Sequence, residues 1–279
     1  MLAAQRRELI LAQVRRTGAA RVSDLTQSLG VSDMTVRRDL EALARAGLIE
    51  KVHGGATATS STYEPGFEVK QLREQAEKVA IAKAGVGFVE AGSAVGLSAG
   101  STTWTIAREL RQVPGLTLVT NSMEVANVLH HGPRDDQTVL LTGGVRTRSG
   151  ALVGPVAVQS PRGLNLNVVF MSVHGMETEA GFTTPNLMEA DTNRALVAAG
   201  RRLVVLADST KWGGVGVSTF ARLDEADVLV TDMGLTAPAQ AVLGERVGEL
   251  VLAPSILTPD AELGEDNATR DLPPPATPR

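Results

Sequence analysis

Six short apolar runs alternate with helical patterns from residue 94 onward, and this alternation constrains the fold more than any other feature of the sequence. The runs expected to be strands are AVGLSA, LTLVTN, TVLLTG, NVVFMSV, LVVLAD and VLVTD. Helical patterns are expected over residues 102–111, 122–131, 187–199 and 236–243. Buried strands that alternate with helices form a mainly parallel sheet covered on both faces. The sequence therefore predicts a three-layer α/β domain over residues 85–253.

The rest of the chain divides around this domain. Residues 1–58 have a different, helix-rich pattern, and residues 59–84 are expected to be a linker followed by one charged helix from about residue 68 to 84. Residues 254–279 are proline-rich and polar, which predicts a disordered tail. A length of 279 residues, 43% of them hydrophobic, fits about two folded domains.

Composition excludes several classes of protein. The chain has no cysteine, so it has no disulfides and no thiol ligands for zinc. No apolar run approaches the roughly 18 residues of a membrane span, and the start of the chain does not have the pattern of a secretion signal. These features predict a cytoplasmic protein without membrane contact. HExxH and carboxylate–histidine clusters are also absent, so we expect no metal site and no cofactor.

The segment VSDMTVRRDLEALARAGLIEKVHGG, residues 31–55, predicts a DNA-binding helix followed by a hairpin. Ser32 is a suitable N-cap, and Val36, Leu40 and Leu43 fall on one stripe of the helix. A short helix precedes it across a glycine turn, which makes a helix-turn-helix whose second helix would enter the major groove. Residues 1–51 hold nine Lys and Arg against six Asp and Glu, although the whole chain carries a net charge of −4.

Two adjacent arginines of this helix have different possible roles. A guanidinium binds a guanine edge or clamps a phosphate, and Arg38, opposite the apolar stripe, is the better candidate for a base contact than Arg37. Ser32 and Thr35 lie at the helix N-terminus, where a phosphate is favoured. Asp39 is expected to orient arginines or to cap locally. The alternative is a solvated surface helix that binds no DNA.

A second constellation follows the first strand of the α/β domain. The loop Ala99–Thr103 consists of small and hydroxyl residues, so its backbone N–H groups can approach a phosphate at a helix N-terminus. An ordinary strand-to-helix turn is the alternative. Other loops at the same predicted sheet edge favour a site for a phosphorylated sugar or polyol. The first loop and these others together contribute Gly100, Ser101, Thr102, Thr103, Asn121, Ser122, Gly143, Gly144, Arg146 and, as the counter-charge, Lys211.

The sequence resembles the DeoR family of bacterial transcriptional regulators. The likeness is specific in Ser32-x-x-Thr35-Val36-Arg37-Arg38-Asp39-Leu40 and in the wing His53-Gly54-Gly55-Ala56. It continues through VGLSAGSTT, VTNS, LTGG, MEADTNRAL and ADSTKW, and covers roughly residues 5 to 252. The resemblance implies a winged helix that binds operator DNA, with His53, Gly54 and Gly55 in the wing. His53 would either reach a phosphate or only close the turn.

The resemblance also implies an effector domain whose fold is shared with ribose-5-phosphate isomerase and glucosamine-6-phosphate deaminase. It adds Gly175 and Glu189 to the effector site and places Ser98 there, where much of the family has an aspartate. Asn193 stands where a lysine is common. A sugar-phosphate-sensing repressor of sugar or polyol catabolism genes is the function implied.

Two alternatives remain open from the sequence. The α/β domain either only oligomerises, or it is an isomerase- or deaminase-like enzyme with His174, Glu177, Glu179 and Glu189 as its candidate groups. No spaced carboxylate–histidine relay supports the enzyme, so we expect none. Because one recognition helix per chain reads one half of a symmetric operator, a homo-oligomer, either dimer or tetramer, is expected.

Overall fold

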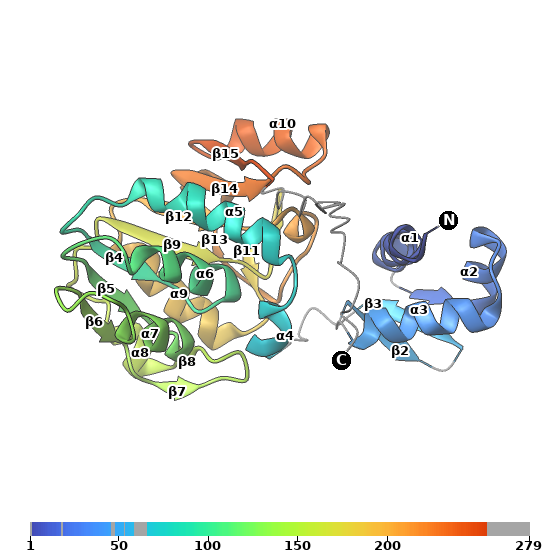
Figure 1. The fold of residues 1–279 in the computed structure, drawn as a ribbon, viewed down its shortest axis with the longest axis horizontal. Helices are drawn as coiled ribbons and strands as arrows, with labels where there is room; N and C mark the ends of the chain where they lie inside the picture. Colours follow the sequence, from blue (N-terminus) through green and yellow to red (C-terminus); the bar gives the residue numbers. More distant parts are fainter. Residues whose placement is uncertain (1, 18, 46–47, 53, 59–65, 256–279) are drawn as a thin grey trace, which may run out of the picture.

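The computed structural model describes residues 2–17, 19–45, 48–52, 54–58 and 66–255. Elements α1 to β3 form one body and elements α4 to β15 form a second (Figure 1). Three sequence predictions lie wholly or largely outside these ranges. They are the role of His53, the linker over residues 59–65 and the tail beyond residue 255.

The N-terminal body is a winged helix with three helices and a three-stranded antiparallel sheet in the order β1-β3-β2. The sequence predicts the helices and the β2–β3 hairpin but not β1, which pairs with β3 and closes the sheet. The elements are α1 (Ala3–Thr17), β1 (Ala19–Arg21), α2 (Val22–Leu29), α3 (Asp33–Arg45), β2 (Ile49–Val52) and β3 (Gly55–Ala58).

The apolar stripe predicted for α3 faces the core of this body. Val36, Leu40 and Leu43 are buried and pack with Ile10 of α1 and Leu25 of α2. Burying one face of α3 leaves its opposite face for solvent, as expected of an amphipathic helix. The stripe therefore fixes which side chains α3 presents to solvent.

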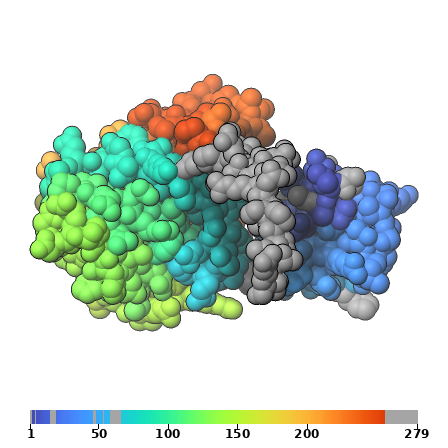
Figure 2. Space-filling view, in the orientation of Figure 1, coloured from blue at the N-terminus to red at the C-terminus, as the bar shows by residue number. Residues whose placement is uncertain are grey.

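The second body is built on a seven-stranded parallel sheet in the order β15-β14-β12-β9-β4-β5-β6. All six predicted strands are present, and β15 is an edge strand that the sequence analysis missed. The strands are β4 (Ala94–Leu97), β5 (Thr117–Thr120), β6 (Thr138–Leu141), β9 (Val168–Ser172), β12 (Leu203–Leu206), β14 (Val228–Asp232) and β15 (Leu250–Ala253). In the space-filling view, β14, α10 (Ala237–Arg246) and β15 occupy one edge of the domain (Figure 2).

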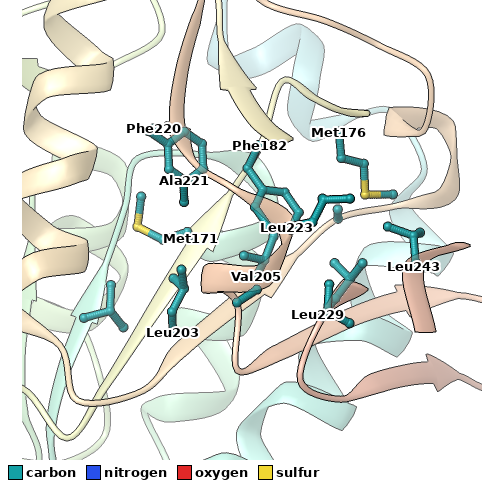
Figure 3. Close-up of a cluster of buried hydrophobic side chains, with 14 of the residues drawn as sticks. Met171, Met176, Phe182, Leu203, Val205, Phe220, Ala221, Leu223, Leu229 and Leu243 are labelled. Atoms are coloured by element: carbon teal, nitrogen blue, oxygen red, sulfur yellow. The ribbon is translucent and has the colours of Figure 1, made fainter. Parts of the chain in front are cut away.

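Two separate apolar layers cover the faces of this sheet, which confirms the predicted three-layer architecture. One face packs against α5 (Gln75–Gly85), α6 (Ser101–Leu110) and α7 (Met123–His130). The other packs against α9 (Leu187–Ala199), α10 and a small antiparallel sheet in the order β10-β11-β13 (Figure 3). That sheet consists of β10 (Gly175–Glu177), β11 (Gly181–Thr184) and β13 (Ser218–Ala221).

Strand order locates the point where ligands bind in such folds. The chain runs outward from β4 through β5 to β6 and then crosses back to β9 on the other side of β4. Ligands bind in open parallel sheets at the carboxyl edge where the order reverses. Here that edge lies at the ends of β4 and β9, next to residues 98–103 and 172–175.

The charged helix predicted from about residue 68 to 84 is wrong in one respect, because the structure divides it. α4 (Phe67–Gln71) ends before Leu72, and α5 begins at Gln75. Glu74 lies between them in the left-handed region at φ 45°, which is unfavourable for a residue with a Cβ. We call residues 66–78 the connector corner.

Candidate functional site

The solvent face of α3 presents its two arginines differently. The Arg37 guanidinium is bound to the Asp33 carboxylate one turn earlier, with Nη2 donating to Oδ2 at 3.3 Å. Arg38 is exposed and makes no hydrogen bond or ion pair with any described residue. The structure therefore leaves the Arg38 guanidinium available to an outside partner and tethers that of Arg37.

A buried ion pair fixes the position of α3 against α1. Asp39 is only 6% exposed, and its Oδ2 accepts a hydrogen bond from Nε of Arg6 at 2.5 Å. Nε of Arg7 lies 4.0 Å from the other carboxylate oxygen. Asp39 thus orients arginines of α1, as the sequence predicts, and links the two helices across their interface.

The start of α3 and the hairpin turn complete this surface. Oγ of Ser32 accepts a hydrogen bond from the Thr35 backbone N–H at 3.3 Å and lies 2.9 Å from its hydroxyl. Both hydroxyls therefore stabilise the helix start that they were expected to present to a phosphate. A Cβ at Gly55 would lie 2.3 Å from the Ala20 carbonyl oxygen, so the wing strand requires glycine there, whereas Gly54 is exposed in the turn.

The loop after β4 has the close backbone approach expected of a phosphate cradle. A Cβ at Gly100 would lie 1.8 Å from Oγ of Ser172 on β9, so a side chain does not fit there. Ser101, Thr102 and Thr103 form the first turn of α6, and the Thr103 hydroxyl donates to the Gly100 carbonyl at 3.0 Å. The cradle (residues 99–103) thus lies at the carboxyl edge between β4 and β9.

Three predicted effector residues hold the loops rather than face outward. Ser98 is fully buried, and its Oγ accepts from the Ser172 N–H at 3.0 Å. Asn121 is also fully buried, and its Oδ1 accepts from the Ala99 N–H at 2.8 Å. The Ser122 hydroxyl accepts from Val125 N–H and caps α7. These contacts use polar atoms that the sequence reading assigned to a ligand.

The remaining predicted effector residues are divided between two regions. Gly143, Gly144 and Arg146 follow β6, and Nη2 of Arg146 lies 3.8 Å from Glu124 on α7. Glu189 is buried in the first turn of α9, where it accepts hydrogen bonds from the hydroxyls of Thr184 at 2.8 Å and Ser149 at 3.4 Å. Two strands, β4 and β5, therefore separate β6 and its loop from β9, while Glu189 belongs to the layer on the α9 face.

Two further predicted positions have clear structural surroundings. A Cβ at Gly175 would lie 2.1 Å from the Gly214 carbonyl oxygen, so the turn after β9 packs directly on the loop that precedes β13. Asn193 is buried on α9, and its Oδ1 has no hydrogen-bond partner among the described residues. The amide thus occupies a buried position where the family commonly has a lysine.

Lys211 lies in a group of charges that the sequence analysis did not identify. Its Nζ is 4.0 Å from Oδ2 of Asp208, which is 1% exposed just beyond the end of β12. Burial by itself would raise the pKa of Asp208, but Lys211, hydrogen bonds from Thr210 and the charge of Lys78 outweigh it and lower that pKa. The carboxylate therefore stays ionised inside the domain.

Lys78 reaches the same group from α5. It is 4% exposed, and its Nζ donates to the carbonyl oxygens of Lys70 at 2.7 Å and Arg73 at 2.5 Å. Burial lowers the pKa of Lys78 to about 8, although Asp208 acts in the opposite direction. No sequence pattern marked this lysine, since its partners are backbone carbonyls and a distant carboxylate.

The groups weighed for catalysis have other contacts. Oε2 of Glu177 accepts from the backbone N–H groups of Glu179 and Ala180, and these hydrogen bonds, led by the one from Ala180, lower its pKa. A carboxylate used to close a hairpin turn in this way is poorly suited to accept a proton from a substrate. Within the described ranges, no three His, Asp or Glu side chains come together as a metal site would require.

Two further observations concern the molecule outside the cradle. A hollow of about 840 Å³ lies between α8 (Pro155–Gln159), the loop over residues 160–164 and α9, away from the cradle. Among the residues that the structure describes, no helix is both long and apolar enough to span a bilayer.

Comparison with known families gives two matches that together span most of the chain. Residues 6–62 match the family model described as the DeoR-like helix-turn-helix domain. Residues 73–233 match the one described as the DeoR C terminal sensor domain. The first match contains the winged helix, and the second contains the cradle, Asp208 and Lys211.

Curated relatives are similar over nearly their whole length. The chain is 36% identical over 242 residues to the HTH-type transcriptional regulator GlpR of Haloferax volcanii, covering 86% of this chain and 94% of the relative. It is 29% identical to the HTH-type transcriptional repressor CsqR of Escherichia coli, covering 88% and 94%. Among solved structures, ribose 5-phosphate isomerase A from Neisseria gonorrhoeae is 16% identical at a TM-score of 0.36, covering 51% and 55%.

Proposed function

The chain belongs to the DeoR family of transcriptional regulators, and from that premise we propose that it is a repressor released from operator DNA by a phosphorylated sugar or polyol. That it is a DNA-binding regulator follows from the family. Repression is suggested by relatives named as repressors. The observation that carries the effector half is Gly100, whose backbone lies at the sheet edge where a Cβ would meet Ser172.

In the DNA-binding half, α3 enters the major groove. Arg38 contacts a base edge, because its guanidinium makes no hydrogen bond or ion pair with the residues that the structure describes, while Arg37 clamps a phosphate or remains with Asp33. Ser32 and Thr35 approach a phosphate through the helix N-terminus rather than through free hydroxyls. The wing residues His53, Gly54 and Gly55 follow the DNA backbone.

In the effector half, a phosphate binds to backbone N–H groups of the cradle. Thr102 lies in the first turn of α6, where the helix dipole favours an anion, and Lys211 supplies the counter-charge. Ser98, Asn121 and Ser122 shape the loops through the contacts described above. Recognition of the sugar hydroxyls therefore depends on other groups, among them the turn at Gly175 at this edge and Glu189 at the start of α9.

Release follows from linkage between the two domains. A ligand shifts the protein away from DNA only if it binds the DNA-incompetent arrangement more tightly than the competent one. Two copies of the chain place two α3 helices on the half-sites of a symmetric operator, so the active species is a homo-oligomer in the cytoplasm.

A domain that only oligomerises is the second candidate, and the position of Ser98 favours it. The hydroxyl of Ser98 is engaged by β9, and Asn193 stands in place of a common lysine, so two groups typical of the family's site are missing. An oligomerisation domain would bind no phosphorylated sugar.

A thermal-shift screen separates these functions. The purified chain is heated with ribose 5-phosphate, fructose 6-phosphate and glycerol 3-phosphate, and in parallel with ribose, fructose and glycerol. A ligand that binds only the folded state raises the melting temperature. We expect a shift with at least one phosphorylated compound, none with its unphosphorylated counterpart, and loss of the shift in Lys211→Ala. Equal melting temperatures throughout would favour the oligomerisation domain.

A further inference from the structure

Two lysines share one buried carboxylate where the connector corner meets the effector loop. Oδ1 of Asp208 accepts hydrogen bonds from the Thr210 N–H and hydroxyl, whereas its Oδ2 has no hydrogen-bond partner among the described residues. Lys211 lies 4.0 Å from that oxygen, and the charge of Lys78 acts on the same carboxylate. A buried carboxylate oxygen without a hydrogen bond is costly, so Asp208 can accept a further donor.

Lys78 is bound to the corner itself. The ammonium group donates two of its three N–H bonds to the carbonyl oxygens of Lys70, in the last turn of α4, and of Arg73, between α4 and α5. The Lys70 carbonyl also accepts from the Arg73 backbone N–H at 3.3 Å, so Lys78 adds to the contacts that close the end of α4. Glu74, held at φ 45°, lies next to them, so the corner stores a strained backbone that the Lys78 contacts help to hold.

A second contact joins the corner to the cradle. The ring of Phe67 on α4 packs edge-on against Trp104, with ring centroids 5.9 Å apart. Trp104 is the fourth residue of α6, directly after the cradle, and the Arg108 guanidinium carbon lies over its ring, 5.2 Å from the centroid. Any shift of α4 therefore changes the surroundings of Trp104.

We propose that Lys78 is the coupling residue that passes effector binding from Lys211 through Asp208 to the connector corner. This inference rests on the proposed function and adds its regulation. When a phosphate binds Lys211, Asp208 loses the nearer of its two cations. Lys78 then turns toward Oδ2 of Asp208, releases the carbonyls of Lys70 and Arg73, and lets α4 leave its position.

The physical basis is competition among a small number of charged groups that are shielded from water. A phosphate carries about two negative charges at neutral pH and competes with Asp208 for Lys211. Glu74, Arg73 and Lys211 are the other ionisable groups that act on Lys78. A neutral Lys78 amine is not attracted electrostatically to the Asp208 carboxylate, so the coupling requires Lys78 to be protonated.

The two tryptophans of the chain allow ligand binding and coupling to be measured separately. Trp212→Phe leaves Trp104 as a reporter beside Phe67, and Trp104→Phe leaves Trp212 as a reporter next to Lys211. Each protein is titrated with inorganic phosphate, ribose 5-phosphate, fructose 6-phosphate and glycerol 3-phosphate while fluorescence is recorded. We expect both reporters to respond to the same compound.

Asp208→Asn and Lys78→Met then test the coupling, with Lys83→Met on the exposed side of α5 as the matched control. We expect Lys78→Met to reduce the Trp104 response at least fivefold, while the Trp212 midpoint changes less than threefold. Asp208→Asn should reduce the Trp104 response equally and lower the Trp212 midpoint, because the carboxylate that competes with phosphate for Lys211 is then absent. Lys83→Met should leave both responses unchanged. Undiminished Trp104 responses alongside a normal Trp212 titration would overturn the coupling.

Two further outcomes complete the test. Raising the pH from 7 to 9 neutralises Lys78 without any substitution, so the Trp104 response should fade at pH 9 while that of Trp212 persists. This arm stands if either variant fails to fold, and an equal Trp104 response at both pH values would contradict the proposal. Silence of Trp212 toward every compound would instead refute the proposed effector function and, with it, the coupling.

Discussion

Replacing Asp39 by asparagine should destabilise the winged helix more than any other single charge removal on α3. The substitution leaves the Arg6 guanidinium, with 12% of its side chain exposed, without its anionic partner. Breaking a buried pair costs about 3–5 kcal/mol, and partial exposure to water places this one near the lower end, at about 2–3 kcal/mol. A body of this size has a total stability of roughly 3–9 kcal/mol. Asp39→Asn therefore removes a large share of it.

The assay uses the fact that both tryptophans lie in the α/β domain. Urea unfolding followed by far-ultraviolet circular dichroism reports on both domains, while tryptophan fluorescence reports on the α/β domain alone. With a slope of about 1 kcal/mol per molar urea, the transition midpoint of the winged helix should fall by about 2–3 M urea. The fluorescence transition should stay in place.

Asp33→Asn is the matched control on the same helix. It breaks the pair with Arg37, whose side chains are 57% and 49% exposed, and such surface pairs contribute about 1 kcal/mol or less. Adding Arg6→Gln to Asp39→Asn should recover part of the loss, because the unpaired buried charge is then absent. If Asp39→Asn costs no more than Asp33→Asn, the reasoning about the buried pair is refuted.

Three further predictions concern binding and pH. Arg38→Ala should weaken binding to an operator selected in vitro by about 1–3 kcal/mol and should weaken binding to random DNA much less, whereas Arg37→Ala should weaken binding to both DNAs alike. If Arg38→Ala weakens binding to both DNAs equally in an anisotropy assay, Arg38 is a phosphate clamp. Gly100→Ala places a Cβ 1.8 Å from a serine hydroxyl and should abolish the thermal shift with phosphorylated compounds without changing DNA affinity, while Gly87→Ala, with open space around it, should change neither. The pKa of Lys78 is about 8 in the folded chain and 10.5 in the unfolded chain. Between these pH values the unfolded state binds more protons than the folded state, so the free energy of unfolding should rise with pH, by at most about 3 kcal/mol. Lys78→Met removes this rise in urea titrations at pH 8 and 10, and an identical pH slope in both proteins would show that the lysine is not buried as a cation.

The sheet was predictable because each of the predicted strands is marked by a local pattern in the sequence. Runs such as LVVLA, residues 203–207, are apolar throughout, which indicates burial on both faces, and the segments that follow them begin with polar residues. Strand β15 was missed although its sequence, LVLA, is apolar; it is a short run that stands just before the proline-rich end of the chain, with no helical pattern after it. Successive side chains of a strand point to opposite faces of the sheet, so alternate residues of each strand belong to the two different apolar layers.

The site was less predictable because its contacts cross between strands. Nothing near Ser98 indicates that its hydroxyl accepts from the backbone of Ser172, since this depends on the register of β4 against β9. The break before α5 likewise depends on Lys78 and two carbonyls rather than on a proline or glycine. Asp208 had one available signal, a carboxylate placed directly after a fully apolar strand, where burial without a partner would be costly.

We propose that the protein binds operator DNA and releases it when a phosphorylated sugar or polyol binds. The most direct test is fluorescence anisotropy of a DNA fragment enriched by the protein from a random library, titrated with and without each phosphorylated compound and its unphosphorylated counterpart. We expect at least a tenfold loss of DNA affinity with one phosphorylated compound and no change with its counterpart. Tight, sequence-specific binding that no phosphorylated compound alters would contradict it.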